Sequence, residues 1–397
     1  RFRLKPNQAQ EQSLRQFAGA RRWIWNWAFA KKQAYYQATG KTCTKKMLED
    51  ELVLLKKQPE TAWLAQMDSQ SLQQAIADLE KAYKGFFDHT KQFPRFKKKG
   101  RSEESFRIPQ RVYVKGHHLI VPKLGEIRLR LSQPVTLPTK SATFKLDALG
   151  HWYVTLTTQI EINELPEVPD FWEVEGFDLG LSALVVTSAG EKIEAPKYYR
   201  KAENKIATAN RSLSRKKRPG RNYAKQRRKL AKAHAKVAAQ RRELIHKLTR
   251  LVTTWYKGIC LEDLCVKGLA RTKLAKSILD AAFGEIRRQL EYKGKWYGCH
   301  VKAINRWYAS TKTCNQCGLL NEKLSLSQRV WTCVCGISHD RDVNAAVNIK
   351  REGYKKMEED VQKQHRRSDG LSKLACGATV RPLDQRRVAK KQESHAL

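Results

Sequence analysis

The chain has 397 residues, in which 78 Lys and Arg face 39 Asp and Glu, so its formal charge at pH 7 is +39. This length is enough for two or three domains with a sizeable core. Such a charge predicts a polyanionic partner, because a protein that neutralises phosphates releases their counterions. No apolar run approaches the roughly 18 residues of a membrane-spanning helix, so we expect no membrane partner.

The N-terminal part reads as a short strand followed by helices. Residues 1–6 alternate as a strand does, and Leu14, Phe17, Arg21, Trp25 and Ala28 recur at helical spacing. Aromatic residues in this helix alternate with cations, a composition suited to base stacking and phosphate contact or to an ordinary helical core. The candidate nucleic-acid contacts here are Arg21 and Arg22, together with the polar face of a second helix after Asp68, namely Ser69, Gln70, Gln73 and Gln74.

From residue 106 to 162 the period changes to two, with glycines between the apolar runs. This pattern predicts a small antiparallel β domain, a barrel that the N-terminal strand could join. Residues 164–170 read as a linker. Residues 174–195 then predict three antiparallel strands, with Asp178 inside the first of them. A carboxylate in an apolar strand is costly to bury without a partner.

Residues 201–250 hold 18 Lys and Arg against two acids. Leu230, Val237, Leu244 and Leu251 recur every seven residues, which predicts a long helix or a helical hairpin. Its one-sided charge favours a nucleic-acid groove over a solvated surface helix. The candidate contacts in this segment are Lys216, Lys217, Arg218 and Arg221.

Residues 258–264 form a short apolar run that ends in Glu262 and Asp263, as a buried parallel strand would. We choose Glu262 as the functional acid, because Asp263 points to the opposite face of a strand. An amphipathic helix over residues 278–297 and another strand over 301–307 follow. After Lys350 the basic sequence has no clear periodicity, so residues 353–397 are predicted to be a disordered tail.

Four cysteines lie in two close pairs separated by fifteen residues, Cys314 with Cys317 and Cys333 with Cys335. This is the spacing of a zinc ribbon, although the second pair has one residue between its thiols instead of two. His339 stands nearby as a substitute ligand. The nine cysteines therefore read as reduced thiols and metal ligands, which predicts a cytoplasmic protein.

Asp342 lies at the start of a small-residue helix, so three acids now stand in comparable settings: Asp178, Glu262 and Asp342. Three carboxylates repel one another unless cations are present. Two magnesium ions held by them could activate a water and stabilise a leaving 3′-oxygen. The expected order βββ-α-β-α-β-α, with acids on the first strand, a later strand and the last helix, is that of an RNase H-like nuclease.

The sequence resembles the TnpB family, RuvC-like proteins encoded by bacterial insertion sequences. The resemblance rests on RFRLKPN, RRWIWNWAFAKK, FPRFKKKG, GFDLGLSAL, ICLEDLCVKGL, GEIRRQLEYKGKWYG, the ribbon and HDRDVNAAVNI, and it spans essentially the whole chain. It implies a catalytic triad at Asp178, Glu262 and Asp342, and ribbon ligands at Cys314, Cys317, Cys333 and Cys335.

The resemblance implies an RNA-guided DNA endonuclease. A guide RNA from the transposon end would pair with one strand of double-stranded target DNA beside a short flanking motif, and one protein monomer would cut. It also implies association with the bacterial nucleoid when bound to DNA. The implied domains are a wedge-like β-barrel (1–7 and 93–168), a helical recognition domain (8–92), a RuvC-like nuclease (169–310 and 337–352), a zinc ribbon (311–336) and the tail (353–397).

Three other functions stay open at this point. The first is a nuclease-inactive, RNA-guided repressor, whose signature would be the loss of a triad acid. The second is a transposase or resolvase that cuts without a guide, and copurifying RNA would discriminate against it. The third is a nonspecific zinc-ribbon protein that binds nucleic acid, which leaves the three acids unexplained.

Overall fold

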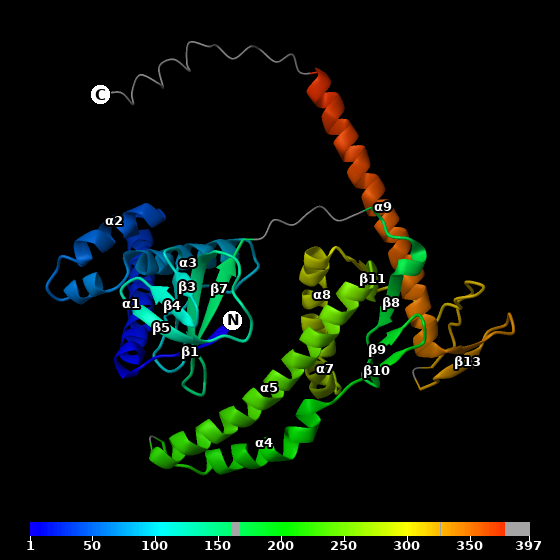
Figure 1. Ribbon diagram of the computed structural model, residues 1–397, viewed down its shortest axis with the longest axis horizontal. Coiled ribbons are helices and arrows are strands. Elements are labelled where there is room, and N and C mark those ends of the chain that lie inside the picture. The colour runs from blue at the N-terminus through cyan, green and yellow to red at the C-terminus, as the bar shows by residue number, and fades with distance from the viewer. Residues whose placement is uncertain (160–166, 219, 326, 378–397) are drawn as a thin grey trace. The chain divides into compact units, whose positions relative to one another are not determined.

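Two separate β-sheets organise the chain, one in each of two structural units (Figure 1). The computed structural model describes residues 1–159, 167–218, 220–325 and 327–377. The first unit comprises residues 1–161 and 217–232, and the second comprises 162–216 and 233–397. The predicted linker at 164–170 lies partly outside the described residues.

The sheet of the first unit is antiparallel throughout, in the order β2-β6-β7-β1-β5-β4-β3. The N-terminal strand β1 lies between β5 and β7, which confirms that it joins this sheet. Among the described residues the end strands β2 and β3 do not pair, so closure into a barrel stays a prediction. The strands are β1 (Phe2–Lys5), β2 (Ser105–Ile108), β3 (Tyr113–Lys115), β4 (His118–Val121), β5 (Gly125–Arg130), β6 (Thr139–Leu146) and β7 (Trp152–Thr158).

The helices of this unit confirm the predicted helical pattern. The long helix α1 (Gln8–Thr39) begins at Asn7, which forms a capping box with Gln10, and ends at Gly40 in the left-handed region. Asp68 caps α3 (Ser69–Phe87) through the amide of Ser71. Between them lie α2 (Lys45–Leu55) and a 3-10 turn over Ala62–Gln66.

The sheet of the second unit has the order β10-β9-β8-β11-β12. The first three strands are antiparallel, as predicted, and β11 and β12 run parallel to β8. The sheet is therefore mixed, antiparallel from β10 to β8 and parallel from β8 to β12. The strands are β8 (Val174–Asp178), β9 (Ala183–Thr187), β10 (Lys192–Glu194), β11 (Gly258–Glu262) and β12 (His300–Ile304).

The basic segment forms a helical hairpin, as predicted, of α4 (Tyr198–Ser214) and α5 (Arg221–Trp255). Its seven-residue stripe holds only in part, because Val237 is buried and Leu244 is half-buried whereas Leu251 is 54% exposed. The helix expected over 278–297 is two helices, α7 (Ala275–Ala281) and α8 (Phe283–Tyr297). Ala282 breaks it because its backbone is left-handed, with a φ of 57°. A short helix, α6 (Val266–Leu269), precedes them.

The predicted disorder after Lys350 is wrong for residues 353–377, because α9 (Arg341–Gly377) continues through them. Apolar side chains hold the first turns of this extension on the core: Met357 is buried, and Tyr354 packs edge-on against Phe171. In the sequence this face is marked by a four-residue spacing from Ile349 through Gly353 to Met357. Residues 378–397 lie outside the described part of the chain.

The helix α9 approaches the sheet closely because glycine lies at the contact. A Cβ atom on Gly176 of β8 would come within 2.1 Å of the Ala346 carbonyl oxygen, and one on Gly353 would come within 2.4 Å of the Cys260 sulfur. Ala345 and Ala346 complete this small-residue contact. No helix in the described residues combines the length and apolar character needed to cross a membrane.

We predict that Gly176→Ala lowers the free energy of unfolding by about 3 kcal/mol or more, because the added methyl collides with backbone and not with a flexible side chain. Chemical denaturation of the full chain measures this change. Gly284→Ala is the matched control, since its Cβ would meet only a side-chain atom, at 3.9 Å. Equal stabilities for the two variants would contradict a close helix–sheet contact at Gly176.

Candidate active site and metal centre

Two of the three acids lie at the same edge of the second sheet. β8 and β11 are parallel neighbours with Phe177 opposite Leu261, so Asp178 and Glu262 are the next residues along each strand. Alternation places Gly176 and Asp178 on the face that α9 covers. Glu262 shares this face with Cys260, which contacts Gly353 of α9. The strand register therefore brings two carboxylates together from positions far apart in sequence.

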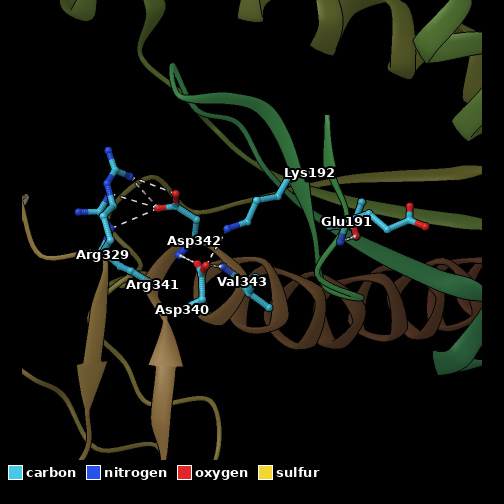
Figure 2. A network of polar contacts seen from close by, with 8 residues as sticks. Glu191, Lys192, Arg329, Asp340, Arg341, Asp342 and Val343 are labelled. Atoms are coloured by element: carbon cyan, nitrogen blue, oxygen red, sulfur yellow. Dashed lines mark hydrogen bonds and ion pairs between the residues drawn. The ribbon is translucent and has the colours of Figure 1, made fainter. Parts of the chain in front are cut away.

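The third acid, Asp342, lies in the first turn of α9, one residue later than the helix start at Arg341. Asp340 caps this helix, because its carboxylate accepts hydrogen bonds from the amides of Asp342 (3.0 Å) and Val343 (3.2 Å) (Figure 2). Lys192 of β10 also binds Asp340, at 2.6 Å. Through Asp340 the start of α9 is therefore bound to β10, the strand at one side of the sheet.

The charges of Glu262 and Asp342 both act on Asp178. Burial, followed by the charges of Glu262 and Asp342, raises the pKa of Asp178 to about 7, against the opposing effect of Arg341 and Arg329. A buried carboxyl with two acidic neighbours favours its protonated form unless a cation joins it. Carboxylate oxygens are the donors that a hard divalent cation prefers.

Each remaining acid has its own polar partners. Glu262 accepts a hydrogen bond from the hydroxyl of Ser310. Asp342 is bound by two guanidinium groups, those of Arg329 at 3.1 Å and Arg341 at 3.1 Å, as Figure 2 shows. These three partners were missed from the sequence. In the sequence, a serine or arginine near the ribbon has no feature that marks it as a partner of the carboxylates, because only the fold brings them together.

Asp263 lies away from this constellation. Its carboxylate binds Arg287 of α8 and Arg306 after β12, and these hydrogen bonds lower the pKa of Asp263. The side chain thus has guanidinium partners outside the Asp178 site. The neighbouring Glu262 instead contributes to the raised pKa of Asp178.

The four cysteines form a compact cluster beside this site. Among the described residues they are the one group of candidate ligands in which all atoms lie within 4.8 Å of one another. The Sγ atoms of Cys314 and Cys335 are 3.8 Å apart, and those of Cys317 and Cys333 are 3.6 Å apart. Four sulfurs bound to one zinc ion at about 2.3 Å would lie about 3.8 Å apart, so the cluster fits zinc.

Cys333 and Cys335, the pair with one residue between its thiols, both place their sulfur atoms in the cluster. Cys333 begins a tight turn closed by the Gly336 amide, and Gly336 has a φ of 85°. Two short strands, β13 (Val330–Thr332) and β14 (Ser338–Asp340), flank this turn. The Nε2 atom of His339 lies 3.1 Å from the Cys314 sulfur, so the substitute ligand named from the sequence is within reach of the cluster.

The thiols ionise unequally when no cation is present. Burial opposes ionisation of Cys314, but the amides of Cys317 and Gln316, together with His339, lower its pKa to about 6. The Cys335 amide favours a thiolate at Cys333, yet burial and the neighbouring thiols raise its pKa to about 12. Four thiolates at this spacing therefore require a cation.

Two asparagines fasten the cluster to α9. Asn344 accepts from the Asn315 amide at 2.9 Å and donates to the Thr313 carbonyl at 2.8 Å. Asn348 donates to the carbonyls of Ser310 (2.8 Å) and Thr313 (2.6 Å). The two lie four residues apart on the buried face of the helix, and buried amides at helical spacing are the sequence signal that could have identified them.

The candidate nucleic-acid contacts from the sequence lie at two places. In the first unit, Ser69 and Gln73 are exposed on α3, Gln70 and Gln74 are half-buried, and Arg21 is paired with Asp78 at 2.8 Å. Arg22 lines a groove with Trp23 and Trp63. Lys216, Lys217, Arg218 and Arg221 are exposed around the turn between α4 and α5.

Comparison with known proteins identifies the family. The chain is 34% identical over 388 residues to a "Putative RNA-guided DNA endonuclease" of Streptomyces pristinaespiralis, covering 96% of this chain and 91% of that protein. It is 36% identical over 407 residues to "Putative RNA-guided DNA endonuclease InsQ" of Escherichia coli, covering 97% and 96%. The chain belongs to the TnpB family.

Family models match three parts of this TnpB chain: a helix-turn-helix domain (1–41), a probable transposase (157–273) and a Cas12f1-like TNB domain (283–349). In the structure, residues 8–39 of the region matched by the helix-turn-helix model form one continuous helix. The fold matches a Cas12f1–sgRNA–target DNA complex, with a TM-score of 0.55 and 14% identity over 87% of this chain and 83% of that one. The TnpB chain thus shares the Cas12f1 fold.

We predict that the raised pKa of Asp178 destabilises the metal-free TnpB fold as the pH rises from 4 to about 7. An acid with a higher pKa in the folded than in the unfolded chain favours folding at low pH, and this advantage is lost on ionisation. Asp178→Asn should therefore stabilise the protein by about 2–3 kcal/mol more at pH 8 than at pH 5. Denaturant titrations in chelator measure the difference, and equal effects at both pH values would refute it.

Proposed function

We propose that this protein is an RNA-guided DNA endonuclease of a transposable element. The observation that supports the proposal is the strand register that puts Asp178 and Glu262 at the ends of neighbouring parallel strands, with Asp342 in the first turn of the helix that packs on both. The names of the TnpB relatives support the nuclease activity and the RNA guide. The charge of +39 supports nucleic-acid partners.

In this proposal the three carboxylates hold divalent cations, two magnesium ions in the full site. When bound, such ions activate a water and stabilise the leaving oxygen in an in-line phosphodiester hydrolysis. The Ser310 hydroxyl orients Glu262. Arg329 and Arg341 neutralise Asp342 in the metal-free protein, and their guanidinium groups are suited to a phosphate of the bound strand.

In this proposal the guide RNA and the protein recognise different features of the target. An RNA derived from the transposon end pairs with one strand of double-stranded DNA, and the basic protein surfaces bind backbone and heteroduplex shape. The exposed cations around the α4–α5 turn are the proposed backbone contacts. Ser69, Gln70, Gln73 and Gln74 on α3, together with Arg22, are the proposed contacts to the flanking motif, and Arg21 supports them through Asp78.

The domain assignment follows the same proposal. Residues 1–7 and 93–168 form the wedge-like barrel, 8–92 the recognition domain, 169–310 and 337–352 the RuvC-like nuclease, and 311–336 the ribbon. One protein monomer would act with its RNA, associated with the bacterial nucleoid when bound to DNA. The four cysteines would hold one structural zinc ion.

A nuclease-inactive RNA-guided repressor is the second candidate. It would share the fold and the nucleic-acid surfaces but would lack a carboxylate of the triad. All three acids are present in this chain, which favours the enzyme.

Sequencing the RNA that copurifies with the protein, from cells that carry its flanking DNA, tests the guide. We expect one species with a defined 3′ end, which then supplies the target for a magnesium-dependent cleavage assay. Random cellular RNA alone would instead favour a guide-independent transposase or resolvase.

We predict that Asp178→Ala reduces cleavage by at least a thousandfold, because the remaining acids cannot hold both ions. Binding of RNA and target should stay within twofold of the wild type, as filter binding in chelator measures. Asp340→Asn is the comparison, because the Asp340 carboxylate caps α9 and lies outside the proposed triad. This variant should retain much more cleavage activity than Asp178→Ala. Loss of RNA binding together with cutting would make Asp178 a structural residue.

We predict one zinc ion per chain, measured by elemental analysis of the purified protein. Cys333→Ser should lower the zinc content and the melting temperature, since the cluster depends on all four thiolates. Cys265→Ser, an exposed cysteine outside the cluster, should change neither quantity. Full zinc content in Cys333→Ser would assign the fourth ligand to His339.

A further inference from the structure

Trp307 is the most exposed large aromatic side chain among the described residues, with 85% of its surface accessible. It lies in the loop between β12 and the cysteine cluster. We propose that Trp307 stacks on a nucleobase of the DNA strand held at the three carboxylates. This inference rests on the proposed function and adds a substrate-binding residue to that site.

Both ends of this loop contact Glu262. Ile304, the last residue of β12, pairs with Glu262 across the parallel strands, and Ser310 donates a hydrogen bond to its carboxylate. Trp307 is three residues from each end. Three residues of extended chain span at most about 11 Å, so the backbone of Trp307 stays within that distance of both anchors.

The loop is held in place by its own contacts. The Asn305 side chain accepts from the Trp307 amide at 3.0 Å, and the Asn305 carbonyl accepts from the Tyr308 amide at 3.0 Å. Arg306 binds Asp263, and Tyr308 packs against the core under α9. These neighbours fix the backbone on both sides of Trp307 while leaving its indole in solvent.

A nucleobase is the occupant that fits this placement. An indole ring stacks on any base, because every base has a π-face, and such stacking is independent of sequence. Arg306 and Lys312 place positive charge in the same segment, where a phosphate backbone would pass. Phosphates of one strand in a duplex are about 3.4 Å apart along the axis, so the stacked base should lie within about three nucleotides of the cut.

The same sheet offers two matched controls at its opposite edge. Trp172 and Trp255 are each 75% exposed. Trp172 lies two residues before the start of β8, and Trp255 ends α5 three residues before β11 begins. Parallel strands start at one edge and end at the other, so both indoles lie away from the edge that holds Asp178 and Glu262.

The test uses the complete protein–RNA complex and a guided target DNA. 2-Aminopurine, a fluorescent base that stacking quenches, replaces successive bases within three nucleotides of the mapped cut, and chelator keeps the target intact. We expect quenching at one or two positions that Trp307→Ala relieves and Trp255→Ala does not. Single-turnover cleavage with magnesium should fall about tenfold in Trp307→Ala. Trp307→Phe should stay within about threefold of the wild type.

The outcomes separate the two proposals. A wild-type complex that never cuts guided DNA would overturn the proposed function, and the Trp307 proposal with it. A wild type that cuts, with Trp307→Ala matching Trp255→Ala in both fluorescence and rate, would overturn the Trp307 proposal alone. Slow cleavage in Trp307→Ala without any fluorescence change would assign Trp307 to loop structure and would equally overturn stacking.

Discussion

The approach of α9 to β8 and β11 is the constraint on which the rest of the second unit depends. The helix axis can come this near because Gly176 and Gly353 present no Cβ atom at the contact and Ala346 presents a single methyl. Asp342 belongs to the first turn of that helix, so its position relative to the two strand acids is set by backbone packing. A side chain at Gly176 would lift the helix and move the carboxylate with it.

The cysteine cluster and the acids are linked through the same helix. Asn344 and Asn348 bind the carbonyls of residues 310–313, and Ser310 in that segment binds Glu262. The structural metal would therefore order a loop whose other end supports a strand acid. Arg329, which lies in the ribbon just before β13, neutralises Asp342, so the ribbon contributes both backbone position and charge to the site.

Sequence reasoning located the elements better than their ends and contacts. Apolar periodicity identified the antiparallel strands around Asp178 and the basic hairpin, because burial fixes those patterns. It could not show the break at Ala282, which depends on a left-handed residue inside an amphipathic run. The tail was misjudged because the sparse buried positions of α9, such as Met357, lie among many charges.

The three acids could be chosen from their local settings, yet their proximity needed the fold. Phe177 opposite Leu261 is a register that no local pattern encodes, and it decides that Asp178 meets Glu262. Ser310 reaches Glu262 only because of the position of the loop after β12, and Arg329 and Arg341 reach Asp342 because of the position of the β13–β14 hairpin. Such contacts are set by tertiary packing, so residue type and spacing alone gave no reason to select them.

The basic hairpin and the ribbon both arise in connections between elements of the second sheet: α4 and α5 join β10 to β11, and the cysteines lie between β12 and α9. The ends of each insertion are held by the scaffold itself. Doubling the length of a flexible loop between fixed ends costs only about 0.6 kcal/mol. This architecture therefore leaves the size of these two insertions free to change while the carboxylates stay in register.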